Sequence, residues 1–75
     1  MHADAIQHAR EQYGAYRDRA HQAEQQANWQ HAITCWNKAA AFADVLGQAD
    51  DVIQANAQAA RCWQHITGGL AAPHH

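Results

Sequence analysis

Two pairs of residues combine a histidine with a cysteine at helical spacing. His31 and Cys35 are four residues apart and Cys62 and His65 are three apart, so each pair would share one face of a helix. If the two helices pack antiparallel, the four side chains could form a tetrahedral zinc site, because imidazole nitrogen and thiolate sulfur suit Zn²⁺. Neither pair has the short-loop spacing of zinc motifs, so we favour packing cysteines and solvent-facing histidines, with no metal or other cofactor.

The sequence contains little else that could support catalysis. Its 75 residues include no serine, no glycine-rich phosphate loop and no nucleophile elbow, and no paired carboxylates suggest a catalytic cleft. Ligand pockets usually need roughly 300 Å³ or more, which is hard to build in a domain this small. We therefore expect a protein that is not an enzyme.

The charge balance argues against direct binding to nucleic acid. The chain has five Lys and Arg residues and seven Asp and Glu residues, so its formal net charge is −2. This balance predicts no basic surface that could bind phosphates. No apolar run reaches the roughly 20 residues that span a bilayer, and the N-terminus lacks the pattern of a secretory signal. We expect a cytoplasmic protein whose two cysteines are reduced thiols and which binds no membrane.

Helix-forming residues dominate the chain and predict an all-α, three-helix fold. The sequence holds 19 alanines and 10 glutamines, and both residue types favour helices over strands. The predicted helices cover about residues 3–26, 29–46 and 50–67, with Asn28 as the N-cap of the second and Gly47 just past its end. Residues 1–67 would form one domain, and Gly68-Gly69 would begin a flexible tail over residues 68–75.

Apolar spacing assigns different roles to the faces of these helices. The first helix carries a seam of 3.5-residue spacing, which is typical of lengthwise helix packing. Because the other two helices could cover one another, we expect this seam to mediate self-association into a homodimer. Its residues are Ile6, Ala9, Tyr13, Tyr16 and Ala20. The predicted core consists of Ala32, Ile33, Trp36, Ala39, Ala43, Leu46, Ala59, Trp63 and Ile66.

The first two predicted helices resemble a single tetratricopeptide repeat. Ala32 and Trp36 match that repeat's small and aromatic positions on its second helix, and Tyr16 and Ala20 match the aromatic and small positions on its first. No second copy follows 34 residues later. The resemblance implies one antiparallel helical hairpin with a third helix packed on it, and it leaves open a role as a peptide-binding adaptor.

A second resemblance covers roughly residues 20–63. The pattern is similar to that of the ANR-type small transcription regulators, although Trp63 directly follows Arg61-Cys62 where the family places its tryptophan earlier. The resemblance implies a negative regulator that binds an AraC/XylS-type transcription activator through protein contact. A zinc-stabilised helical module is the other alternative. The matching residues are Ala20, Ala23, Glu24, Trp29, Ala32, Trp36, Ala39, Ala43, Arg61 and Cys62.

Overall fold

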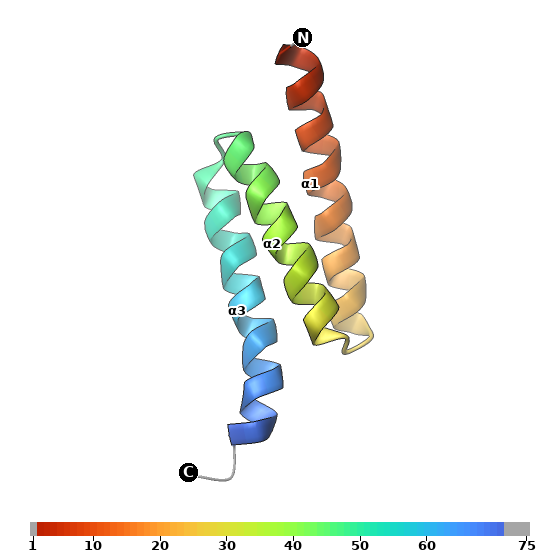
Figure 1. Ribbon diagram of the computed structural model, residues 1–75, viewed down its shortest axis with the longest axis vertical. Helices are drawn as coiled ribbons and strands as arrows, with labels where there is room; N and C mark the ends of the chain where they lie inside the picture. Colours follow the sequence, from red (N-terminus) through yellow and green to blue (C-terminus); the bar gives the residue numbers. More distant parts are fainter. Residues whose placement is uncertain (1, 72–75) are drawn as a thin grey trace.

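The protein folds into three α-helices joined by two short turns. The computed structural model describes the backbone of residues 2–71 and the side chains of residues 4–68. Helix α1 spans His2–Gln25, α2 spans Trp29–Val45 and α3 spans Ala49–Ala71, with no strand in this part of the chain (Figure 1). The predicted all-α, three-helix fold is confirmed.

The helices form a single layer with α2 in the middle. Helices α1 and α3 each pack along α2, and their contact with one another is far smaller. The Cα atoms extend 53 × 22 × 12 Å, so the layer is only about one helix thick. The N-terminal part of α1 and the C-terminal part of α3 project past α2 at opposite ends of the molecule (Figure 1). Each outer helix therefore has only one helical neighbour.

The first turn reverses the chain through a left-handed residue that is not glycine. Ala27 has φ +56°. The Asn28 N–H donates to the Ala23 carbonyl at 2.8 Å and the Ala27 N–H donates to the Glu24 carbonyl at 3.0 Å, which is the hydrogen-bond pattern of a Schellman motif. The Asn28 side chain then accepts a hydrogen bond from the His31 N–H at 3.4 Å and caps α2 as predicted.

The second turn repeats this geometry with glycine at the left-handed position. Gly47 has φ +71°. Its N–H donates to the Asp44 carbonyl and the Gln48 N–H donates to the Ala43 carbonyl, both at 3.0 Å. The prediction that Gly47 lies just past the end of α2 is confirmed, because glycine adopts this backbone conformation without steric cost.

Helix α3 is longer than predicted at its C-terminal end. It passes through Gly68 and Gly69 and ends at Ala71, so the expected boundary near Thr67 and the expected tail over residues 68–71 are wrong. Adding a residue to an existing helix adds a backbone hydrogen bond, which here outweighs the roughly 1 kcal/mol that each glycine costs. The rest of the expected tail, residues 72–75, lies outside the described residues.

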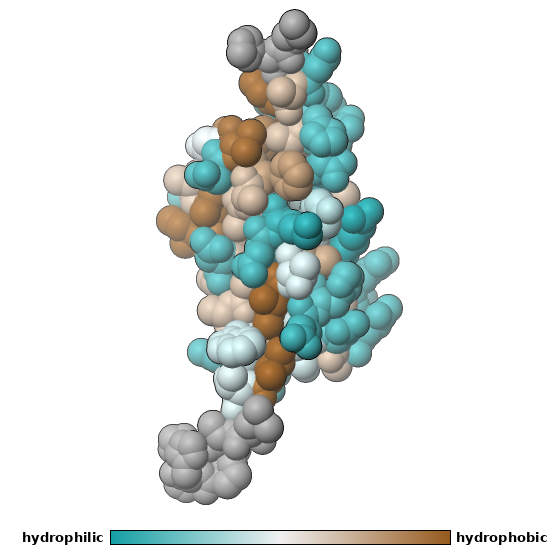
Figure 2. Space-filling view, viewed as in Figure 1, coloured by the Kyte–Doolittle hydropathy of each residue, from teal (hydrophilic) through white to brown (hydrophobic). Residues whose placement is uncertain are grey.

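Alanine makes up most of the core. The buried residues are Ala9, Ala20, Ala23, Ala32, Cys35, Trp36, Ala39, Ala40, Ala43, Ala55, Ala59 and Cys62. Trp36, only 3% exposed, is the one large side chain among them. Small side chains let neighbouring helix backbones approach closely, which is how so thin a layer excludes water. Figure 2 shows a narrow apolar strip down the lower middle of this face, further apolar side chains towards its upper end, and a hydrophilic outer edge along α1.

One predicted core residue lies on the surface. Trp63 is 55% exposed, because α3 has a single neighbour and Ala59 and Cys62 occupy the face that meets it. The other predicted core residues are buried or half-buried. Ala32, Trp36, Ala39, Ala43 and Ala59 are buried, and Ile33, Leu46 and Ile66 are half-buried.

The paired turns predict opposite effects of exchanging alanine and glycine. Gly47→Ala should lower the free energy of unfolding by about 1 kcal/mol, because an L-residue is strained at positive φ. Ala27→Gly should raise it by a few tenths to about 1 kcal/mol for the converse reason. Urea denaturation followed by circular dichroism measures both. Gly14→Ala is the control: a Cβ at Gly14 in α1 meets no atom within 4 Å, so this variant should be stabilised by helix propensity alone.

Candidate interaction groove

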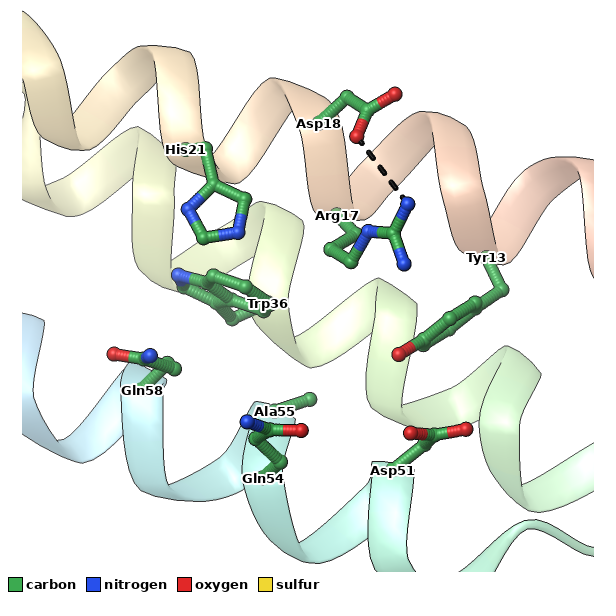
Figure 3. A pocket seen from close by; sticks show the side chains of 9 residues that line it. All are labelled: Tyr13, Arg17, Asp18, His21, Trp36, Asp51, Gln54, Ala55 and Gln58. Atoms are coloured by element: carbon green, nitrogen blue, oxygen red, sulfur yellow. Dashed lines mark ion pairs between the residues drawn. The ribbon is translucent and has the colours of Figure 1, made fainter.

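A groove of about 480 Å³ runs between α1 and α3, with α2 beneath it, and it is larger than we expected for a domain of this size. We call it the α1–α3 groove. Figure 3 shows its two walls facing each other across the Trp36 indole. The lining residues are Tyr13, Arg17, Asp18 and His21 from α1, Trp36 from α2, and Asp51, Gln54, Ala55 and Gln58 from α3. The groove exists because α1 and α3 pack on α2 and not on each other.

The α1 wall combines charge with aromatic surface. The Arg17 guanidinium lies 3.6 Å from the Asp18 carboxylate and 5.6 Å above the centre of the Tyr13 ring. The His21 ring meets Trp36 edge-on, with 5.0 Å between ring centroids. This wall therefore offers a cation, an anion and flat aromatic surfaces within two helical turns.

The α3 wall is polar, and sequence analysis did not predict it. Asp51, Gln54 and Gln58 line the groove at spacings of three and four residues, which place them on one helical face. The spacing of these three polar residues was the one feature of the sequence that could have indicated this wall. It could not be read as a wall before the structure showed which surface of α3 turns towards α1. The side-chain amides of Gln54 and Gln58 in this wall can both donate and accept hydrogen bonds.

One carboxylate, which accepts a hydrogen bond from the groove's Trp36, joins all three helices. Glu24 Oε2 on α1 accepts a hydrogen bond from Trp36 Nε1 on α2 at 2.6 Å and another from Cys62 Sγ on α3 at 3.3 Å. Glu24 is half-buried, whereas Trp36 and Cys62 are buried. Because a buried N–H without an acceptor is costly, the Glu24 carboxylate fixes both the indole orientation and the approach of α3.

The Cys62 thiol is held in its protonated form. Burial, followed by its hydrogen bond to Glu24 and the negative charge of that carboxylate, raises the pKa of Cys62 from 9.0 to about 11, with Arg61 acting weakly in the opposite direction. A thiol with this pKa is a poor nucleophile and a poor metal ligand, since both roles need the thiolate. Cys62 therefore acts as a structural hydrogen-bond donor.

The predicted zinc ligands do not come together. His31 Nε2 and Cys35 Sγ are 3.6 Å apart on α2, but Cys62 turns to Glu24. His65 stacks flat on Trp29, with 4.0 Å between centroids and an interplanar angle of 4°. Over the residues whose side chains are described, no group of three or more potential ligands forms. In this structure the two pairs engage different neighbours and do not form the predicted Cys2His2 cluster.

The seam predicted for self-association packs inside the chain instead. Ala9 and Ala20 are buried, and Tyr13 and Tyr16 lie half-buried against the core. Only Ile6 remains exposed, at 44%. The prediction failed because it assumed that α2 and α3 cover only one another, whereas α2 lies between α1 and α3 and buries part of its surface against each.

Tyr16 illustrates how the seam is used. Its ring stacks on Phe42 of α2 at 5.9 Å and 12°, with the charged groups of Arg19 and Lys38 at 5.1 and 5.6 Å from the ring centroid. Cation–π contacts of this kind are favourable. The Tyr16 ring therefore contacts residues of its own chain on several sides.

Comparison with known proteins identifies no relative: no family model, curated protein or solved structure matches this chain significantly. Among residues 2–71, no helix combines the length and apolarity needed to cross a bilayer. The resemblances to ANR-type regulators and to a tetratricopeptide repeat stay predictions.

Removing the Glu24 carboxylate should destabilise the fold. Glu24→Ala leaves the Trp36 N–H and the Cys62 S–H without their acceptor, and we expect the free energy of unfolding to fall by about 1–3 kcal/mol in urea titrations. Glu11→Ala is the matched control, since Glu11 on the same helix is exposed and bonds only Gln7, at 3.2 Å. Its effect should stay within about 0.5 kcal/mol. Equal losses in the two variants would contradict the proposed role of Glu24.

The Cys62 thiol should make stability depend on alkaline pH. The folded protein holds this proton more tightly than the unfolded chain, so its contribution is complete below pH 9 and is lost as the pH rises from 9 to about 11. Urea titrations at several pH values should show a steeper fall for the wild type than for Cys62→Ala. Cys35→Ala, which also removes a buried thiol, should keep the wild-type slope.

Proposed function

We propose that this chain is a non-enzymatic interaction protein whose α1–α3 groove receives a segment of a protein partner. The groove itself carries this proposal. It is large enough for several side chains, it has an aromatic floor, and its walls offer an arginine, two aspartates and two glutamine amides. Aromatic and arginine anchors surrounded by polar groups are typical of protein-binding surfaces.

The groove chemistry favours a protein over a nucleic acid. Arg17, the one lysine or arginine among the lining residues, lies beside Asp18, and Asp51 stands on the opposite wall (Figure 3). Phosphates would meet net negative charge there, in keeping with the formal charge of −2 for the whole chain. A peptide with a basic or amide side chain is the better match.

We further propose that the partner is an AraC/XylS-type transcription activator, which the chain regulates negatively. This step follows the resemblance to ANR-type regulators. Residues carrying it, such as Ala20, Glu24, Trp36 and Ala39, hold the three helices together and so maintain the groove. Capture of a segment from the activator's dimerisation or regulatory surface would shift it towards an inactive state.

A general peptide-binding adaptor is the second candidate. The observation that favours it is the position of the groove, which lies between the first and third helices and above the second, as the resemblance to a tetratricopeptide repeat would require. The two candidates differ in what they bind: a regulator prefers one activator, whereas an adaptor binds short peptides that share a motif.

The partner is tested with purified AraC/XylS-type activators from the same genome. Isothermal titration calorimetry should show saturable binding to one of them, and a reporter controlled by that activator should fall when the chain is expressed. Binding to no activator, or tight binding to promoter DNA without the activator, would contradict the proposal. An array of unrelated peptides that bind equally well would favour the adaptor.

The groove is tested by adding a charged side chain to its α3 wall. Gln54→Arg places a second cation opposite Arg17, and we expect partner affinity to fall by about tenfold or more, which corresponds to about 1.4 kcal/mol. Gln30→Arg is the matched control because it adds the same side chain at an exposed position of α2 that does not line the groove. Equal affinities of both variants would show that the partner binds elsewhere.

A further inference from the structure

The side of α3 opposite its groove-lining residues carries a row of uncharged residues. Within this row Ile53 is 66% exposed and Trp63 is 55% exposed, although both are large apolar side chains. Successive members are separated by four, three, four, three and four residues. We call this row the outer stripe of α3; its members are Ala49, Ile53, Asn56, Ala60, Trp63 and Thr67.

This spacing is that of a helix that packs lengthwise against another helix. An average separation of 3.5 residues keeps the stripe on one side of α3 over about five helical turns. The chain itself provides no helix for it, because α3 packs along α2 and makes only a far smaller contact with α1. The α1 seam, which shows the same spacing, is satisfied within the chain, so the outer stripe is the lengthwise seam still without a partner among the described helices.

We propose that the outer stripe binds the outer stripe of a second copy of this chain in antiparallel orientation. The intervals between successive stripe residues are four, three, four, three and four, so their order is the same from either end of α3. A two-fold axis near Gln58 therefore pairs Ile53 of each copy with Trp63 of the other. It also pairs Asn56 with Ala60, and Ala49 with Thr67. The dimer would cover Ile53 and Trp63 of both copies. At its centre, the short side chains of Asn56 and Ala60 would let the two helix backbones approach closely.

Charge at the edge of the stripe favours the antiparallel orientation. Asp50 and Arg61 lie on the same flank, 11 residues apart, with the acidic group near the start of α3 and the basic group towards its end. In an antiparallel pair, flanks of the same kind meet, so the acidic end of one copy adjoins the basic end of the other. The helix dipoles also oppose one another.

The α1–α3 groove stays open in such a dimer. Gln54 and Gln58 line the groove from a different side of α3 than Ile53 and Asn56, since successive helical residues are rotated by about 100°. The dimer would present two grooves to a dimeric partner, which raises apparent affinity through avidity. The self-association proposal does not depend on the identity of that partner.

Sedimentation equilibrium of the full chain at several concentrations tests the dimer. We expect a reversible monomer–dimer equilibrium that Ile53→Lys and Trp63→Glu each weaken by at least tenfold. Both positions are exposed, so circular dichroism should show wild-type helicity. Ile6→Glu is the matched control, because Ile6 is also a large exposed apolar residue, 44% exposed, but lies on α1, and it should dimerise like the wild type.

Mixing the two charged variants tests the register. An antiparallel pair places Lys at position 53 of one copy against Glu at position 63 of the other, while the second contact keeps its native Ile53 and Trp63. We expect the mixture to form a heterodimer more tightly than either variant forms a homodimer. A monomeric wild type at all concentrations would overturn the proposal, as would charged variants that dimerise normally or a mixture that gains nothing. Activator binding by a strictly monomeric chain would overturn this inference alone and leave the proposed function standing.

Discussion

The arrangement of the three helices depends on the Glu24 carboxylate. Helices α1 and α3 hardly touch, so the α2 core and this one oxygen hold them at a defined distance. The hydrogen bond from Trp36 also sets the plane of the indole that forms the groove floor. Because the N–H and S–H donors are buried, the cost of leaving them without an acceptor makes the arrangement specific as well as stable.

Alanine explains why the protein is a single layer. Small side chains allow close helix contacts, but they add little volume, so α1 and α3 do not close into a bundle around a shared centre. Each outer helix buries one side only. The open geometry leaves two surfaces with distinct chemistry: a polar groove with an aromatic floor between α1 and α3, and an uncharged stripe on the far side of α3.

Local signals in the chain were reliable where short-range physics decides. Asn28 caps α2 and Gly47 follows it because side-chain capping and glycine's access to positive φ involve only neighbouring residues. The same reasoning missed Ala27, which adopts a left-handed conformation that alanine disfavours, and it ended α3 too early at the two glycines. In both places hydrogen bonds along the backbone outweighed the preference of a single residue.

Composition and periodicity were thus enough to determine an all-α chain, three helices and part of the alanine core, because these features follow from helix propensity and from the repeat of 3.6 residues per turn. Which faces meet was decided only by the tertiary structure. Tyr13 and Tyr16 have the spacing of an interface but pack within the chain, whereas Trp63 has the spacing of a core residue but faces outwards. Periodicity shows that a helix has a face to bury, but it carries no information about whether the partner lies in the same chain or in another.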